Sequence, residues 1–450
     1  MDTAALIAKY DRPVPRYTSY PTAPHFSAEV TPAVYARWLA ALPDDAAVSL
    51  YLHVPFCASL CLFCACHTTV ARQEAPLLAY TEGLLAEIDL IADLIGRKQP
   101  VAHVHWGGGT PTALPARSMR AIMQRLRERF DLAPSAEVAV EIDPRTLTAE
   151  HVDALAAMGT NRVSLGVQDF NPTVQKAIGR MQSYELTAAC VTQLRAAGID
   201  AVNLDLIYGL PHQTIEGVAE TVAQAMELNP ARVAVFGYAH VPWMKKHQSL
   251  LPEAMLPGPG ERYAQRDAAE DTIVVRGYVP AGLDHFARPG DAMAIAAEDQ
   301  RLRRNFQGYT TDSAPVLIGL GASSIGSLPE GYVQNHPGVP AWRDAIRAGI
   351  PATARGIALT AEDRVRRSVI EEIMCHGEID LRDIAARFNA CPASLLPTGP
   401  SLHDLAEDGL IQWSGYQLSV TDRGRPFLRN IAAAFDVRLH SGPGRHSAAV

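Results

Sequence analysis

The sequence lacks a long apolar run, an excess of basic residues and the basic, apolar start of a secretory signal. No apolar segment approaches the roughly 18–20 residues needed to span a bilayer, so we expect no membrane partner. The net charge is −8, which argues against a nucleic-acid binder with a basic surface. The first residues, M-D-T-A-A-L-I-A-K-Y-D-R, carry acids where a signal peptide is basic. We therefore expect a soluble cytoplasmic enzyme with reduced cysteines.

Cysteine is also scarce, with 7 in 450 residues, yet four of them lie close together. Cys57, Cys61 and Cys64 have the spacing C-x3-C-x2-C, and Cys66 follows two residues later. Three thiolates this close can hold three irons of a 4Fe–4S cluster and leave the fourth iron open to a substrate. Zinc is a weaker alternative, because zinc sites usually pair two C-x2-C units far apart in sequence. A disulfide is weaker still without a secretory context.

Apolar runs alternate with helical patterns through the first half of the chain. The runs that predict strands are Val48–Val54, Val101–Trp106, Val138–Ile142, Arg162–Val167, Ala201–Ile207 and Arg232–Phe236. Strands and helices in this rhythm predict parallel β/α units, so the fold class is α/β with a partial (β/α)6 barrel. The catalytic domain is predicted over residues 47–335, with the barrel to about residue 256 and an extension beyond it.

Polar residues and glycines gather at the carboxyl end of each predicted strand, where β/α barrels carry their chemistry. Three glycines at positions 107–109 let the backbone approach a ligand closely and expose its N–H and C=O groups. Glu141, Gln168 and Asp205 can accept hydrogen bonds from hydroxyls or an ammonium group. Arg180 can bind a carboxylate through two parallel bonds. Their common location predicts a polar ligand site at the barrel mouth.

A leader over residues 1–46 precedes the barrel. A short helix is predicted over Glu29–Leu42, and prolines at positions 13, 15 and 21 forbid a helix in the stretch K-Y-D-R-P-V-P-R-Y-T-S-Y-P-T-A before it. This leader is either a surface tether or a lid across the barrel mouth that offers Arg12 and Arg16 to an anion.

A different domain is predicted behind the barrel, over residues 336–436. It contains three helices and a hairpin that turns at Ser414-Gly415, which is a winged-helix pattern. Its last helix is acidic and would repel phosphate, so we interpret the domain as a mainly helical structural cap. Residues 437–450 are predicted to be a disordered tail. In the extension, G-L-G-A-S-S only partly matches a dinucleotide fingerprint, so NAD is discounted.

The cysteine spacing, with Phe63 just before the third cysteine, resembles the radical S-adenosylmethionine (SAM) superfamily. In that superfamily three such cysteines bind the cluster, and SAM chelates the open iron. An electron from the cluster then splits SAM into methionine and a 5′-deoxyadenosyl radical. The resemblance implies that the G-G-G-T-P segment meets the SAM amino group.

A wider set of motifs resembles the oxygen-independent coproporphyrinogen III oxidase family, from about Tyr10 to Ile325. The motifs are P-R-Y-T-S-Y-P-T, C-x3-C-x-F-C-x-C, H-W-G-G-G-T-P-T, E-I-D-P-R, S-L-G-V-Q-D-F-N, D-L-I-Y-G-L-P-H-Q-T, Y-A-H-V-P and R-N-F-Q-G-Y-T-T. The resemblance implies anaerobic conversion of coproporphyrinogen III to protoporphyrinogen IX in haem synthesis. The radical takes a β-hydrogen, and two propionates lose CO2 and become vinyls. The electron donor and acceptor are not identified.

The resemblance also implies two SAM molecules. The residues that match contacts of the cluster-bound SAM are Tyr51, Gly108, Glu141 and Ile325. The residues that match contacts of the second SAM are Phe63, Gly109, Thr110, Gln168, Arg180, Asp205 and Ala239. The predicted catalytic set is Tyr51 with the cluster ligands Cys57, Cys61 and Cys64.

The implied substrate carries four carboxylates, so its pocket should be cationic although the whole chain is acidic. The candidate arginines are Arg12, Arg16, Arg301, Arg303 and Arg304. Cys66 as a ligand would close the iron that SAM needs, so we expect it not to bind the cluster.

Two other functions are weighed against the oxidase. The haem-chaperone branch of the same family binds haem, but it generally lacks the cysteine at position 66 and the P-R-Y-T-S-Y-P leader. Both are present here, which favours the oxidase. A regulator of another class could use a cluster and a winged helix to sense oxygen, but the acidic final helix and the SAM-type loops oppose it. A monomer is expected.

Overall fold

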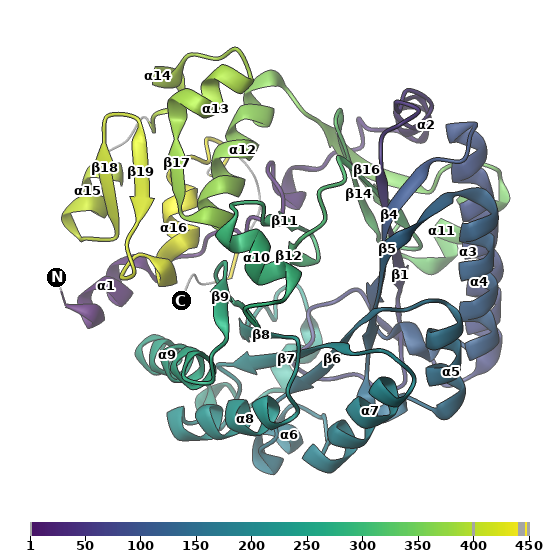
Figure 1. Ribbon diagram of the computed structural model, residues 1–450, viewed down its shortest axis with the longest axis horizontal. Helices are drawn as coiled ribbons and strands as arrows, with labels where there is room; N and C mark the ends of the chain where they lie inside the picture. Colours follow the sequence, from purple (N-terminus) through teal and green to yellow (C-terminus); the bar gives the residue numbers. More distant parts are fainter. Residues whose placement is uncertain (1, 398–400, 440–445, 448–450) are drawn as a thin grey trace.

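A large curved sheet forms the centre of the molecule (Figure 1). The computed structural model describes residues 2–397, 401–439, 446 and 447. Within them, the six predicted parallel strands are neighbours in chain order, which confirms the partial α/β barrel. These strands are β1 (Val48–Val54), β4 (Pro100–Gly108), β5 (Asp131–Ile142), β6 (Arg162–Gln168), β7 (Ala201–Tyr208) and β8 (Arg232–Gly237).

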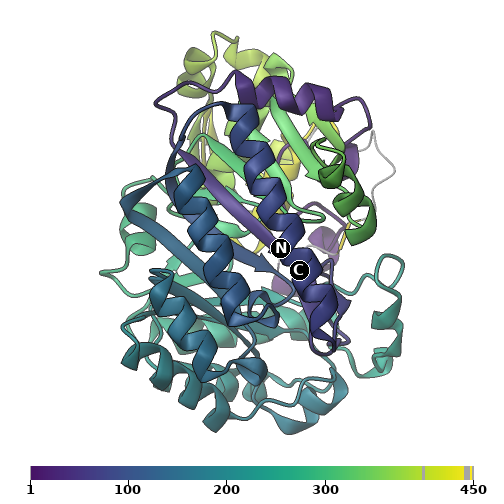
Figure 2. The same ribbon diagram turned by 90° about the vertical axis from the view of Figure 1, so that its right-hand side faces the viewer.

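Each barrel strand turns one face to the helices and the other to the interior. In β6, Val163 and Leu165 are buried in the main core, whereas Ser164 and Gln168 border the central cavity. This alternation follows the two-residue period of a strand. Figure 2 shows α3 and α4 side by side across the outer face. The covering helices are α3 (Glu74–Ile95), α4 (Ala116–Arg129), α5 (Ala149–Ala157), α6 (Pro172–Ala177), α7 (Tyr184–Ala196), α8 (Ile215–Glu227) and α9 (Pro259–Val274).

The sheet extends beyond the six predicted strands on both sides. A seventh parallel strand, β13 (Val316–Leu320), lies beside β1, and all of its residues are buried. The discounted G-L-G-A-S-S motif is therefore the end of a central strand and the turn after it. Antiparallel strands complete the two edges: β14 (Ile325–Leu328), β15 (Gly331–Asn335), β16 (Thr353–Ala358), β9 (Val279–Ala281) and β10 (His285–Ala287).

The strand pairing crosses the predicted domain boundary at residues 335 and 336. β15 pairs with β16 in antiparallel fashion, and α11 (Val339–Arg347) connects them. Trp342 of α11 is fully buried in the main core. The unit built on the central sheet therefore continues to Ala358.

The part of the leader from Asp2 to Tyr20 packs into the C-terminal domain. The leader forms α1 (Thr3–Tyr10), the 3-10 turn η1 (Ala23–His25) and α2 (Pro32–Ala40), which lies within the predicted Glu29–Leu42 helix. Leu6, Tyr10 and Tyr17 belong to the hydrophobic core of the C-terminal domain. The hydroxyl of Tyr17 donates to Asp436 over 3.0 Å. This part of the leader is therefore neither a loose tether nor a free lid.

The C-terminal domain contains helices and a hairpin, as the winged-helix pattern predicts, and a third strand that was not predicted pairs with the hairpin (Figure 1). Of the predicted tail at 437–450, residues 440–445 and 448–450 lie outside the described part. The domain's elements are α12 (Ala361–His376), β17 (Glu378–Asp380), α13 (Leu381–Arg387), α14 (Pro392–Leu395), α15 (Ser401–Glu407), β18 (Ile411–Ser414), β19 (Gln417–Val420), η6 (Arg425–Phe427) and α16 (Leu428–Ala433).

Several short elements complete the loops of the barrel. They are β2 (Phe56–Cys57), β3 (Thr69–Val70), η2 (Pro111–Ala113), η3 (Pro144–Thr146), η4 (Lys246–Leu250), η5 (Glu253–Met255), α10 (Ala292–Glu298), β11 (Arg303–Asn305) and β12 (Gly308–Thr310). Among the described residues, no helix combines the length and the apolar character that crossing a bilayer requires.

Candidate active site

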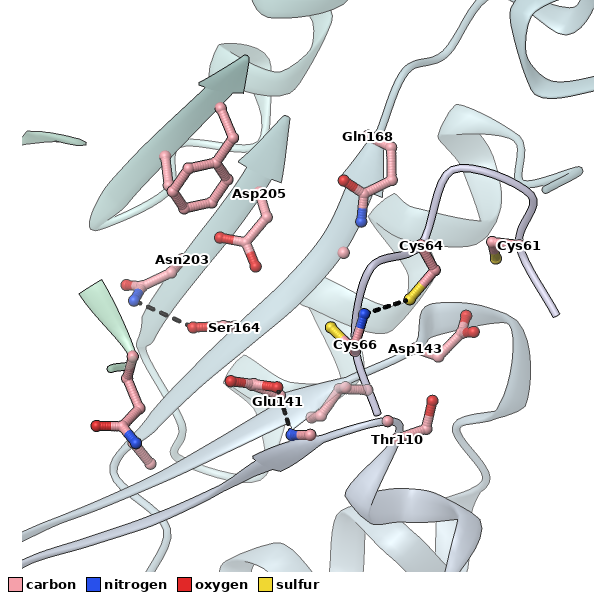
Figure 3. A pocket seen from close by; sticks show the side chains of 18 of the residues that line it. Cys61, Cys64, Cys66, Thr110, Glu141, Asp143, Ser164, Gln168, Asn203 and Asp205 are labelled. Carbon is pink, nitrogen blue, oxygen red and sulfur yellow. Dashed lines mark hydrogen bonds between the residues drawn. The ribbon is translucent and has the colours of Figure 1, made fainter. Parts of the chain in front are cut away.

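A cavity of about 330 Å³ lies inside the barrel, at the carboxyl ends of the strands. Segments far apart in the chain deliver most of the predicted site residues to it, and Figure 3 shows several of their side chains facing one space. The predicted residues that border the cavity are Cys57, Cys61, Phe63, Cys64, Gly108, Gly109, Thr110, Glu141, Gln168, Arg180 and Asp205, and Cys66 borders it too.

Short backbone pairings hold the cysteine loop in shape. β2 pairs with β3, so that Cys57 lies opposite Val70 and the two ends of the loop are joined. The amide of Leu62 donates to the carbonyl of Ile178 over 2.9 Å, which fixes the middle of the loop against the barrel. These bonds satisfy backbone groups of the loop within the protein. The side chains of Cys57, Cys61 and Cys64 border the cavity.

Three side chains from the segment after β8 hold the outer side of the same loop. Lys245 Nζ donates to the carbonyl of Cys66 over 2.8 Å, and Gln248 Nε2 donates to the carbonyl of Phe63 over 2.8 Å. His247 Nε2 lies 2.7 Å from the carbonyl of Cys64. The Gln248 side chain is fully buried. These contacts tie the cysteine loop to the last strand of the barrel.

The sulfur atoms face hydrogen-bond donors. Arg145 Nη2 lies 3.4 Å and Arg180 Nη1 lies 3.6 Å from the sulfur of Cys61. Thr110 Oγ1 donates to the sulfur of Cys57 over 3.5 Å. Positive charge and donors stabilise a thiolate over a thiol, and the thiolate is the form that binds metal.

The thiols differ in their acidity. A hydrogen bond from Cys66 is the main reason that the pKa of Cys64 falls to about 6, with the nearby Lys245 and His247 charges contributing. Burial raises the pKa of Cys57 to about 11. The Cys66 amide also donates to the Cys64 sulfur over 3.4 Å, as the dashed line in Figure 3 shows. Cys66 therefore contacts Cys64, a candidate cluster ligand. That Cys66 itself does not bind the cluster stays a prediction.

The three predicted cluster cysteines border the same cavity. No three Cys, His, Asp or Glu side chains in the described ranges are close enough together to hold one metal ion. A zinc ion needs such convergence, because its four ligands lie about 2.0–2.3 Å from one atom. The three thiols of a cubane cluster bind three different irons, so they need only border the same cavity. All three are free thiols.

Close packing against the end of β1 and the residues just after it requires glycine at positions 108 and 109. Gly108 has a φ of +109°, and a Cβ there would lie 2.6 Å from the ring of His53. A Cβ on Gly109 would lie 2.7 Å from the carbonyl oxygen of Phe56. The Gly109 amide donates to Val54 over 2.8 Å, so the end of β4 is held directly against the end of β1.

Glu141 organises the backbone edge of the cavity. Its Oε2 accepts from the amide of Gly108 over 3.1 Å, and its Oε1 lies 3.1 Å from His105 Nε2. Tyr51 stacks on His105, with ring centroids 5.8 Å apart, and its hydroxyl lies 3.1 Å from His53 Nδ1. Tyr51 is therefore behind the residues that border the cavity.

Two other predicted contacts also lie outside the cavity lining. Ala239 follows β8, and its carbonyl accepts from Gln248 over 3.2 Å. Ile325 is the first residue of β14 and packs beside Phe26 and Tyr332.

Gln168 and Asp205 extend into the cavity from neighbouring strands (Figure 3). Gln168 has a φ of +71°, and the pairing of β6 with β7 shifts by one residue just before it. A positive φ is uncommon outside glycine, and such strain concentrates at functional positions. Burial raises the pKa of Asp205 to about 7, and the nearby Glu141 charge adds to the shift. These two side chains are available to a polar ligand.

Arg180 is more constrained than its prediction as a free carboxylate binder implies. Its Nη1 and Nη2 each lie 3.3 Å from an oxygen of Asp143, and Nη2 donates to the carbonyl of Gly166. Asp143 also accepts from Arg145 over 2.6 Å. The sequence prediction missed Asp143 and Arg145 as site residues, although the D-P-R triplet directly follows the strand that ends at Ile142.

The five candidate substrate arginines do not come together. Arg16 and Arg304 are neighbours, because Arg304 Nη2 donates to the Arg16 carbonyl over 3.2 Å. Arg301 is exposed and pairs with Asp299, and Arg303 is exposed beside Glu371. Arg12 is exposed in the leader. Only Arg16 and Arg304 remain in one place where they could bind the same anion.

Comparison with known proteins connects this site to one family. Residues 51–225 match the radical SAM superfamily, and residues 359–427 match the HemN C-terminal domain. The oxygen-independent coproporphyrinogen III oxidase of Bradyrhizobium diazoefficiens is 51% identical over 437 residues, which cover 97% of each chain. The enzyme of that name from Paracoccus denitrificans is 46% identical, over 98% of this chain and 97% of the relative. The chain belongs to the oxygen-independent coproporphyrinogen III oxidase family.

A solved structure supports the same assignment for the fold. Coproporphyrinogen III oxidase from Escherichia coli, described as a radical SAM enzyme, superposes with a TM-score of 0.91 and 38% identity. The match covers 97% of this chain and 99% of that one. Family membership confirms the predicted resemblance and fold class, and radical SAM enzymes use a 4Fe–4S cluster with SAM. Neither the haem chaperone nor the oxygen-sensing regulator is favoured.

Proposed function

We propose that this chain converts two propionates of coproporphyrinogen III to vinyls without oxygen, giving protoporphyrinogen IX in haem biosynthesis. The observation that supports this most strongly is the convergence of the cysteine loop, the glycine edge and three polar strand ends on one cavity. When bound, the cluster and SAM supply the radical that removes a hydrogen atom from the substrate. The residues described below bind, orient and shield the reactants.

The proposed cluster ligands are Cys57, Cys61 and Cys64. The donors from Thr110 and Arg145 stabilise the thiolate forms of the ligands they face. Lys245, His247 and Gln248 keep the loop fixed, which matters because binding groups accelerate a reaction only when they are correctly placed.

The proposed SAM contacts divide between two molecules. The glycine edge, held by Glu141, offers backbone groups to the first, while Gln168 and Asp205 offer acceptors to the second. The proposed set for the first SAM is Tyr51, Gly108, Glu141 and Ile325. The proposed set for the second is Phe63, Gly109, Thr110, Gln168, Arg180, Asp205 and Ala239. Tyr51, Ala239 and Ile325 do not border the cavity, so they would act through the residues that line it.

The remaining parts of the proposal concern the surroundings. The leader and the C-terminal cap shield the barrel mouth, which keeps water away from a reactive intermediate. We further propose a cytoplasmic monomer served by an electron donor and an electron acceptor of unidentified nature.

The test is an anaerobic assay with reconstituted enzyme, a reductant, SAM and coproporphyrinogen III, followed by mass spectrometry. We expect a product lighter by two CO2 and four hydrogen atoms, formed together with 5′-deoxyadenosine and methionine. The control is Cys57→Ser, which should form none of them. SAM cleavage with an unchanged porphyrinogen would refute the proposed substrate and would lead next to a haem-binding assay.

A further inference from the structure

A second cavity, outside the barrel interior, has five arginines among its fourteen lining residues. It measures about 60 Å³, which corresponds to roughly two water molecules at about 30 Å³ each. A carboxylate fits such a space, whereas a tetrapyrrole ring does not. Its charged lining residues are Arg16 of the leader, Arg262 and Arg266 of α9, Asp284, Arg304 of β11 and Arg429 of α16. We name this space the arginine cavity.

The described lining residues of the arginine cavity carry more positive than negative charges. Arg266 is matched by Asp267 and Glu270 on its own helix. Asp284 is the one acid that lines the described part of the cavity, and it also accepts from His285 over 2.7 Å. Among the described lining residues, Arg16, Arg262 and Arg304 therefore share a single carboxylate.

The hydrogen bonds of these arginines do not supply the missing charge. Arg16 donates to the carbonyl of Gly237 over 2.9 Å, and Arg262 donates to the carbonyl of Tyr238 over 3.0 Å. Two nitrogens of Arg304, Nε and Nη1, have no hydrogen-bond partner among the described residues. Carbonyl oxygens orient a guanidinium but leave its charge uncompensated, and a buried uncompensated charge is costly.

The arginines of this cavity differ in how far they are buried. Arg429 is 7% exposed, and burial, together with the neighbouring Arg16 and Arg304 charges, lowers its pKa to about 9. Arg16 is exposed, although the protein atoms packed around it lower its pKa. A bound anion would relieve both the repulsion and the loss of solvation.

The arginine cavity also joins parts of the chain that are far apart in sequence. Arg304 donates to the backbone of Arg16, and Arg429 donates to the carbonyls of Val14 and Pro15. The Arg304 guanidinium stacks on Tyr309, 4.3 Å from the ring centroid, and Tyr309 borders the main cavity on its other side. An anion here would thus contact the leader, the barrel edge and the C-terminal domain at once.

We propose that the arginine cavity binds a carboxylate, held by Arg16, Arg262 and Arg304, which fastens the leader over the end of the barrel. Two sources share this chemistry. One is a propionate arm of the substrate, a source that rests on the proposed function, and the other is a free small carboxylate.

The first experiment measures binding of coproporphyrin III, a stable tetracarboxylate, by fluorescence with the full-length protein. Arg304→Gln and Arg262→Gln remove charge from the site, Arg304→Lys keeps it, and Arg301→Gln is the matched control at an exposed arginine. If a propionate occupies the site, the Kd should rise about 10- to 100-fold in the two glutamine variants only. Binding of the neutral tetraamide of the same macrocycle should not change.

The second experiment measures the Tm and the protease resistance of the leader in acetate, with acetamide as the control and with ionic strength held constant. If a free carboxylate occupies the site, acetate should raise both in the wild type and in Arg301→Gln but not in Arg304→Gln. The proposal is overturned if coproporphyrin III affinity and the acetate effect are both the same in the glutamine variants and the wild type. Neither assay requires turnover, so failure of the decarboxylation assay does not affect this result.

Discussion

Gly109 provides a sharp test of how the cavity is built. A methyl group at this position would lie 2.7 Å from the Phe56 oxygen and 3.0 Å from both the Phe56 nitrogen and the Val54 oxygen. All three are backbone atoms, so no side chain can rotate away. Overpacking of this kind costs about 1–3 kcal/mol, and weakening the adjoining hydrogen bonds costs about 1 kcal/mol more. Gly109→Ala should therefore lower the free energy of unfolding by about 2–4 kcal/mol.

The matched control is Gly260→Ala, because nothing lies within 4 Å of a Cβ at Gly260 in the first turn of α9. That change should leave stability unchanged or raise it by up to about 1 kcal/mol through helix propensity. Urea unfolding of both variants measures stability, and iron per chain after anaerobic reconstitution measures the cluster. Gly109→Ala should also hold less iron. Wild-type stability and full iron content in Gly109→Ala would refute the packing argument.

Three more predictions concern single side chains. Burial raises the pKa of Asp205 to about 7 in the folded protein, against about 4 when unfolded, so stability should fall as pH rises between these values, by on the order of 4 kcal/mol. Asp205→Asn should reduce the slope in urea unfolding of the cofactor-free protein, and Glu87 and Asp169, whose pKa values are also raised, should keep the rest; an identical slope in the variant would contradict the assignment. Cys66→Ser should keep its iron by elemental analysis, whereas Cys64→Ser should lose it, and iron loss in Cys66→Ser would make Cys66 a ligand. Gln248→Met keeps the side-chain volume but removes the bond to the Phe63 carbonyl, so it should cost about 1–3 kcal/mol and speed iron release to a chelator; unchanged release would show that this contact does not hold the loop.

Local sequence patterns predicted the centre of the site because its residues lie in short segments of the chain. The cysteine spacing and the residues after each parallel strand are short-range features, and the geometry of a β/α barrel brings strand ends together. Arg145 was missed because its importance depends on Cys61 and Asp143, and only the folded chain shows that contact. The partners of Lys245 and Gln248 are likewise almost two hundred residues away.

The edges of the sheet were harder to predict for the same reason. β13 pairs with β1 across more than 250 residues of chain, and no local pattern specifies such a partner. The leader shows no core periodicity in its proline-rich part, yet Tyr17 and Tyr20 are buried in the C-terminal domain. We propose a domain division near Leu359, after β16, because the sheet pairing ends there and the C-terminal core begins with α12.

The central claim is that the barrel cavity brings a radical from SAM to a propionate of coproporphyrinogen III. The most direct measurement uses substrate deuterated at the β-carbons of its propionates, with mass spectrometry of the 5′-deoxyadenosine formed in a single turnover. The account predicts 5′-deoxyadenosine that carries one deuterium, formed in step with loss of CO2 from the substrate. Unlabelled 5′-deoxyadenosine alongside decarboxylated product would contradict it, because the hydrogen would then come from elsewhere.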